Sequence, residues 1–98
     1  LLRQYRQHEI ALYAPSRALN VMFLQKMRNF RLVNDSEELH NKYLPFFTNK
    51  IESFEMILQN PPKAILIFSR TFGQQIKSKC DRHNELGRTK IFLIEEIL

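Results

Sequence analysis

Cys80 and His83 are the two side chains whose types and spacing come closest to a reactive site. They lie three positions apart, so they would share one face of a helix. A metal ion would need further ligands, and His8 and His40 are distant in the sequence. A cysteine nucleophile would also need an orienting third group and oxyanion donors, and no such set can be identified. We therefore interpret Cys80 as a buried core residue and His83 as an exposed turn residue.

Paired carboxylates and glycine-rich loops are two other common sources of catalysis. Glutamates at 37–38 and at 95–96 are sequence neighbours, so the members of each pair would point in different directions on a helix. The two glycines, Gly73 and Gly87, are isolated and cannot form a phosphate-binding loop. We therefore expect a non-enzymatic protein with no catalytic residue, no cofactor and no metal ion.

Basic side chains are the remaining candidates for recognition, because the 98-residue chain has a net charge of +5. Residues 1–34 carry six basic and one acidic side chain, residues 35–60 two and five, and residues 61–98 seven and four. Such blocks either attract phosphates or an acidic partner, or are solvated helix faces. The candidate contacts to an acidic partner or to nucleic acid are Arg17, Arg28, Arg31, Lys63, Arg70 and Lys77.

Three of these candidates, Lys63, Arg70 and Lys77, follow one another at seven-residue steps. On a continuous helix they would form a row that could follow a phosphate backbone. The aromatic side chains fall on the predicted core stripes, which leaves few of them for stacking on bases. The row therefore favours a salt-dependent contact without base recognition.

Apolar residues at three- and four-residue steps predict helices along most of the chain. We expect helices over residues 1–13, 16–30, 35–58 (kinked or restarted at Pro45), 62–80 and 89–98. Asp35 and Glu38 have capping-box spacing, and Gly87 suits a left-handed position at a helix end. Gly73 falls inside a predicted helix, where it would allow a close helix crossing. A short strand over 91–94 is the alternative for the last segment.

Two segments that begin at proline are weakly similar when Pro15 is set against Pro61, an offset of 46 residues. Leu19 then matches Ile65, and each unit would be a helix, a turn and a second helix. This pattern resembles the helical repeats of the HEAT and armadillo class, whose periods are roughly 40–47 residues. The resemblance implies an all-α fold of antiparallel helical hairpins, an α-solenoid fragment. A compact four- to five-helix bundle is the alternative.

The chain has no initiator methionine and ends on apolar residues, so we expect residues 1–98 to be a single helical unit of a longer chain. The predicted function is a non-enzymatic helical protein–protein interaction or scaffold module, and the alternative is a nucleic-acid-binding helical domain. The expected partner is a protein with an acidic surface or the rest of the same chain. No apolar run reaches the roughly 18 residues of a membrane span. A single cysteine favours an intracellular location, in the cytoplasm or nucleus.

Overall fold

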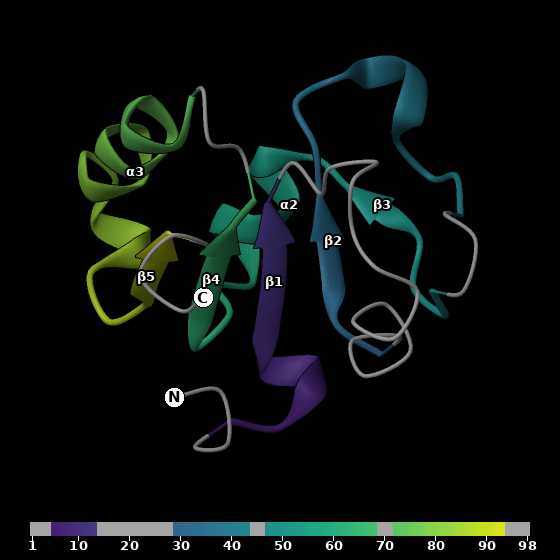
Figure 1. Ribbon diagram of the computed structural model, residues 1–98, viewed down its shortest axis with the longest axis horizontal. Coiled ribbons are helices and arrows are strands. Elements are labelled where there is room, and N and C mark those ends of the chain that lie inside the picture. The colour runs from purple at the N-terminus through teal and green to yellow at the C-terminus, as the bar shows by residue number, and fades with distance from the viewer. Residues whose placement is uncertain (1–4, 14–28, 44–46, 69–71, 94–98) are drawn as a thin grey trace.

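Short apolar runs that pair as strands form the centre of the molecule. The computed structural model describes residues 5–13, 29–43, 47–68 and 72–93. Within these residues a parallel sheet contains β1 (Ile10–Tyr13), β2 (Arg31–Val33), β3 (Ile51–Glu52), β4 (Ala64–Ile67) and β5 (Lys90–Leu93). The strand order is β3-β2-β1-β4-β5, and all the pairings are parallel (Figure 1).

This strand order reverses the direction of the chain once. From β1 the chain proceeds outward through β2 to β3, and it then crosses back to place β4 and β5 on the other side of β1. The reversal therefore lies between β1 and β4, which pair from Ile10 and Ala64 to Tyr13 and Ile67. This is the topology of doubly wound α/β proteins, in which such a reversal is called the switch point.

The helices among the described residues are short. They are the α-helices α2 (Phe54–Gln59) and α3 (Gly73–Asp81) and the 3-10 helices η2 (Gln7–Glu9), η3 (Glu37–Leu39) and η4 (Asn84–Leu86). Ser53 starts α2, because its side-chain oxygen accepts a hydrogen bond from the backbone of Met56 at 3.3 Å. In the described part of the chain, no helix combines the length and apolar character needed to cross a bilayer.

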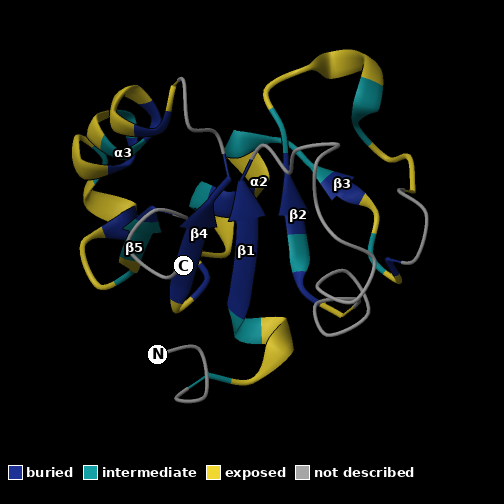
Figure 2. Cartoon of the chain, viewed as in Figure 1, coloured by how far each residue is buried: buried dark blue, intermediate teal, exposed yellow. Residues whose placement is uncertain are grey.

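Strands β1 and β4 are buried along their whole length (Figure 2). Alternate strand residues belong to two core clusters on opposite faces of the sheet. Ile10, Leu12 and Leu66 lie on one face, in a cluster with Phe30 and Phe47. The opposite face packs against α2, α3 and η4, through Ala11, Tyr13, Val33, Ile65, Ile67, Ile57, Ile76, Cys80 and Leu86. Strands buried on both faces are apolar at nearly every position, which accounts for the runs Ile-Ala-Leu-Tyr and Ala-Ile-Leu-Ile.

The predicted all-α fold is wrong in both of its forms, the HEAT/armadillo-like α-solenoid and the compact four- to five-helix bundle. The two apolar runs that dominate the described core are strands, not helix stripes. The repeat also fails, because the offset of 46 sets Ala11 and Leu12 of β1 against Ile57 and Leu58 of α2. A short apolar run fits a buried strand and a buried helical segment equally well, so periodicity could not distinguish them.

The individual helix predictions fail in a consistent way. The segment predicted as a helix over 1–13 contains η2 and then β1, and the helix predicted over 62–80 is β4 followed by α3. In the segment predicted as a helix over 35–58, the described helices are only η3 and α2. Between them Tyr43 forms an isolated antiparallel bridge with Lys50. The helix predicted over 16–30 lies almost entirely outside the described residues.

The last described segment follows the alternative prediction, because Lys90–Leu93 is the strand β5 and not part of the predicted helix. Gly87 has a φ of −60°, so it does not occupy the left-handed position expected of it. Gly73 begins α3 and does permit a close approach. A Cβ atom at this position would lie 3.1 Å from Cδ2 of Leu93 in β5.

Candidate functional site

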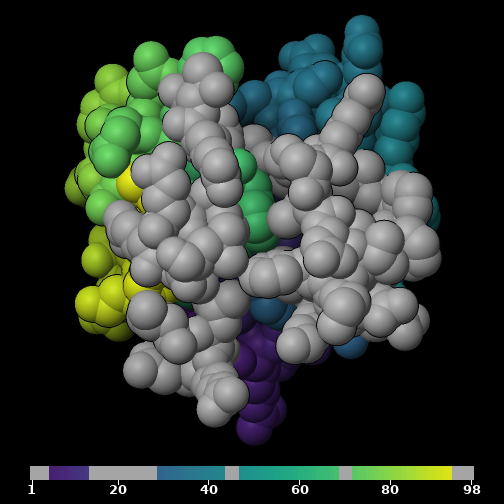
Figure 3. Space-filling view, viewed as in Figure 1, coloured from purple at the N-terminus to yellow at the C-terminus, as the bar shows by residue number. Residues whose placement is uncertain are grey.

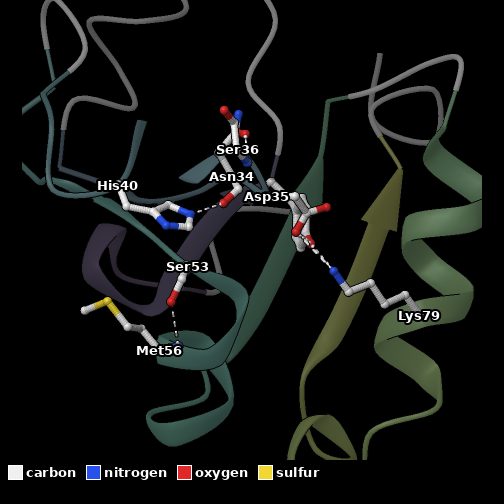
Figure 4. A network of polar contacts seen from close by, with 8 residues as sticks. Asn34, Asp35, Ser36, His40, Ser53, Met56 and Lys79 are labelled. Carbon is white, nitrogen blue, oxygen red and sulfur yellow. Dashed lines mark hydrogen bonds and ion pairs between the residues drawn. The ribbon is translucent and has the colours of Figure 1, made fainter. Parts of the chain in front are cut away.

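The carboxyl ends of β1 and β2 bring a buried tyrosine next to an exposed carboxylate. Tyr13 ends β1, and its hydroxyl donates a 2.6 Å hydrogen bond to Oδ1 of Asp35, which follows β2. Lys79 reaches the pair from α3, and its Nζ donates to Asp35 Oδ1 at 3.0 Å and to the Tyr13 hydroxyl at 3.1 Å. Figure 4 shows Lys79 extending from α3 toward Asp35. Three elements that are distant in the sequence are thus joined by one polar cluster.

An aromatic ring completes the surroundings of the Lys79 ammonium group. Nζ lies 4.1 Å from the centre of the Phe54 ring at the start of α2. The Tyr13 ring centre lies 6.0 Å from that of Phe54, and His83 meets Phe54 edge-on at 5.1 Å. The ammonium group therefore contacts a carboxylate, a hydroxyl and an aromatic face. We call Tyr13, Asp35 and Phe54 together the ammonium cage.

An open concavity of about 440 Å³ adjoins the ammonium cage and shares two residues with it. Its lining residues are Asp35, Glu37, His40, Ser53, Phe54 and Glu55. The three carboxylates make it negative, and Phe54 gives it an aromatic wall. A concavity of this kind favours ligands that carry hydrogen-bond donors or positive charge.

The loop between β2 and η3 is held by its own hydrogen bonds. The Ser36 backbone donates to Oδ1 of Asn34 at 2.9 Å, and Nε2 of His40 lies 2.7 Å from the Asn34 carbonyl oxygen (Figure 4). A carbonyl oxygen can only accept, so Nε2 carries the proton and Nδ1 is the ring nitrogen left for other contacts. The capping role predicted for Asp35 is wrong, because Ser36 is the N-cap residue of η3 and no side chain caps it; Asp35 Oδ1 instead binds Tyr13 and Lys79.

The buried titratable groups near this site are poorly suited to reaction. Burial, followed by the hydrogen bond to Asp35, raises the pKa of Tyr13 far above its ordinary value, so its hydroxyl stays protonated. Burial also raises the pKa of the Cys80 thiol to about 11, and Cys80 is fully buried, as predicted. Neither group offers a nucleophile at neutral pH. The geometry of this cluster is suited to binding.

A second concavity, of about 610 Å³, lies at the amino ends of β4 and β5. It is lined by Pro61, Pro62, Asn84, Glu85, Gly87, Arg88 and Thr89. The Thr89 hydroxyl donates a 2.7 Å hydrogen bond to the Pro62 carbonyl there. Ligands of open α/β sheets bind at the carboxyl ends of the strands, so topology does not favour this concavity.

Arg31, one of the predicted contact residues, has structural partners inside the chain. Its Nε and Nη2 donate to the two carboxylate oxygens of Glu52 at 2.9 and 2.8 Å, and Nη1 donates to the Asn60 carbonyl at 2.7 Å. The Arg31 and Glu52 side chains are only 14% and 16% exposed. Arg31 therefore joins β2 to β3 and to the end of α2.

The other predicted contact residues are not brought into one row. Lys63 precedes β4 and lies 2.6 Å from Glu9, whereas Lys77 lies on α3. The row that was predicted through Lys63 and Lys77 requires one continuous helix, and β4 interrupts it. Arg17, Arg28 and Arg70 lie outside the described residues. Whether these side chains contact a partner stays a prediction.

Sequence reasoning missed Tyr13, Asp35 and Lys79 as a cluster. The available signal was Asp35, a polar residue that directly follows the short apolar run of β2. Nothing in the sequence pointed to Lys79, which is 44 positions from Asp35 and 66 from Tyr13. Spacing along the chain cannot reveal a contact that depends on the fold.

Comparison with protein-family models, with curated proteins and with solved structures gave no match. Among the described residues, no group of three or more histidine, cysteine, aspartate or glutamate side chains is arranged to hold a metal ion. Only the fold class can be assigned, and the strand pairing assigns it. The described part of the chain is a mixed α/β fold with a five-stranded parallel sheet.

Proposed function

We propose that this chain is a small-molecule-binding domain whose ligand lies at the carboxyl end of the sheet, against Asp35. The observation that supports this most is the reversal of strand order between β1 and β4. Open α/β sheets bind ligands outside the carboxyl ends of their strands at this point. Tyr13 ends one of the two strands at the reversal and binds Asp35, whose concavity lies outside the carboxyl ends of the neighbouring strands β2 and β3.

The ligand we propose carries hydroxyl or amino groups that donate to Asp35. The hydrogen bonds from Tyr13 and Lys79 both go to Oδ1 of Asp35, and the side chain is still 55% exposed. The adjoining concavity of about 440 Å³ is of the size that small-molecule sites have. Its three carboxylates attract donors and would repel an anionic group placed among them.

Binding without catalysis agrees with the prediction of a non-enzymatic protein, which stays a prediction. A protein partner and nucleic acid also stay predictions of the sequence. No described cluster of the predicted basic contacts favours either, since Arg31 and Lys63 bind Glu52 and Glu9. We therefore place small-molecule binding at the carboxyl end ahead of these two alternatives.

Thermal unfolding of the full chain against a panel of small polar molecules tests the proposal. The panel would contain polyols, amino sugars, nucleosides, alkylamines and carboxylic acids. A ligand at 100 times its Kd stabilises the folded state by about 2.7 kcal/mol, which is readily measured. We expect the stabilisation to be lost in Asp35→Asn.

The matched control is Glu9→Gln, the same chemical change at the amino end of the sheet, where the ligand response should be unchanged. If every stabilising compound acts equally on wild type and Asp35→Asn, the ligand does not bind at Asp35 and the proposal is wrong.

A further inference from the structure

We propose that the ammonium cage is the recognition site for a primary ammonium group of the ligand, and that Lys79 occupies this cage when the ligand is absent. The inference rests on the proposed function, because it places the rest of the ligand in the adjoining concavity. It adds the chemical class of the ligand, a small organic amine. It also adds a role for Lys79, which fills the cage until the ligand replaces it.

The cage supplies three kinds of partner that an ammonium group can use together. Asp35 Oδ1 and the Tyr13 hydroxyl lie 3.0 and 3.1 Å from Nζ, and the Phe54 ring centre lies 4.1 Å from it. An ammonium group has three N–H donors and is attracted to the face of an aromatic ring. Tyr13 comes from β1, Asp35 from the segment that follows β2, and Phe54 from α2. The cage is therefore complete without α3, which contributes only the cation.

Lys79 is placed so that another ammonium group could replace it. Its side chain is 34% exposed, and that of Asp35 is 55% exposed. Ion pairs and cation–π contacts that are open to solvent contribute little to stability. The lysine stem is long and flexible, so the displaced ammonium group would return to water. The incoming group would make the same contacts in its place.

The concavity selects what can accompany the ammonium group. It shares Asp35 and Phe54 with the cage, and Glu37 and Glu55 add further negative charge. The site therefore favours a cation and disfavours a phosphate or carboxylate at this position. Ser53 and His40 offer polar contacts to hydroxyl groups on the same ligand. The class that fits is a small amine with hydroxyl groups, such as an amino alcohol or an amino sugar.

Replacing the lysine with a free amine tests the inference directly. Lys79→Ala removes the internal occupant, and ethylammonium chloride is the probe, compared with potassium chloride at equal ionic strength. We expect ethylammonium at a saturating concentration to raise the Tm of Lys79→Ala by about 5 °C more than potassium does. The same probe should leave Lys63→Ala, the matched lysine substitution at the amino end, at its potassium value.

Two further variants identify where the probe binds. Lys79→Met keeps a side chain of similar length in the cage, so ethylammonium should have no specific effect on it. Lys79→Ala combined with Asp35→Asn should also lose the response. If Lys79→Ala responds to ethylammonium no more than to potassium, or if the double variant responds equally, the cage does not recognise amines.

If Lys79→Ala does not fold, an NMR titration of the wild-type chain with ethylammonium decides the question. We expect the signals of the Phe54 ring and of the Lys79 side chain to shift together and to saturate. Unchanged signals would overturn the inference. The outcome is separable from that of the proposed function, because a neutral ligand that requires Asp35 would support the function while contradicting amine recognition.

Discussion

The two ends of the sheet differ in the side chains that meet there. At the carboxyl end, side chains bind side chains, as Tyr13, Asp35 and Lys79 do. Main-chain hydrogen bonds join the strands at both ends, from Lys63 N to the Glu9 carbonyl at 2.9 Å at the amino end and from Phe68 N to the Tyr13 carbonyl at 3.0 Å at the carboxyl end. The amino end adds the ion pair of Lys63 with Glu9 and the hydrogen bond from Thr89 to the Pro62 carbonyl. Figure 3 shows the purple N-terminal residues and the η3 segment at opposite ends of the molecule.

We propose that this difference separates a structural end from a functional one. The Lys63 side chain is 71% exposed and the Thr89 hydroxyl binds a main-chain carbonyl, so the amino end should tolerate substitution. A bond between two partly exposed side chains can be exchanged for a bond to a ligand that carries the same group. The carboxyl end should therefore respond to substitution in stability and in binding, and the amino end only weakly, in stability.

The largest contrast is expected between Asp35→Ala and Glu9→Ala, which remove one carboxylate from each end. Asp35→Ala leaves the buried Tyr13 hydroxyl without its acceptor, which costs about 2 kcal/mol. Glu9→Ala should cost distinctly less, because its partner Lys63 is 71% exposed and remains solvated. Urea unfolding at pH 7 measures both variants. Equal losses would remove the distinction between the two ends.

Tyr13→Phe should cost about 1 kcal/mol at pH 8, because it deletes one hydrogen bond and leaves the ring in place. Its pH dependence identifies the cause. The pKa of Tyr13 is raised in the folded state, whereas an unfolded tyrosine ionises near pH 10.

The hydroxyl therefore stabilises the fold fully below pH 10, and this stabilisation is lost as the pH rises further. Above pH 10 the wild type should lose stability relative to Tyr13→Phe by about 1.4 kcal/mol per pH unit. Unfolding curves of both proteins at several pH values between 8 and 11 measure this slope. A constant difference across that range would show that Tyr13 ionises equally in both states.

Thr89→Val tests a side-chain hydrogen bond of the amino end. It removes the 2.7 Å hydrogen bond to the Pro62 carbonyl, and we expect a loss of about 0.5 kcal/mol, because Thr89 is only half-buried and water can replace the donor. Thermal unfolding measures the change. A loss as large as that of Tyr13→Phe would mean that side chains stabilise the two ends equally.

The smallest effect is expected for Lys63→Ala. The hydrogen bond from Lys63 is the largest cause that lowers the pKa of Glu9, so this pKa should rise toward its ordinary value in the variant. An NMR titration of the Glu9 carboxyl carbon would detect the shift. The unfolding midpoint should not change measurably, because the lysine is largely exposed. A clear destabilisation would show that this surface pair is structurally important.

The sequence predicted local features of the core better than its architecture. Cys80 is buried and Ile76 lies with it on one face of α3, as the apolar stripe indicated. Residues 10–13 and 64–67 were assigned to helices, because each run is too short to show a period of its own. Their identity as strands depends on pairing with each other across the intervening chain, which no local pattern records.

The candidate site was less predictable than the core. The side chains that drew attention were those with familiar spacing, such as Cys80 and His83, but Cys80 is buried and His83 packs against Phe54. Arg31 was selected for its charge, but its charge is matched by Glu52. Partners that lie far apart in the sequence decided the role of each of these residues.

The central position of β1 affects how the molecule can form. This strand comes early in the described chain, yet its neighbours β2 and β4 follow much later, and neither can be supplied locally. A ribosome would release Ile10–Tyr13 well before β4 exists to cover one side of it. Pairing of β1 on both sides must therefore await β4, and the nascent segment would need protection from aggregation in the interval.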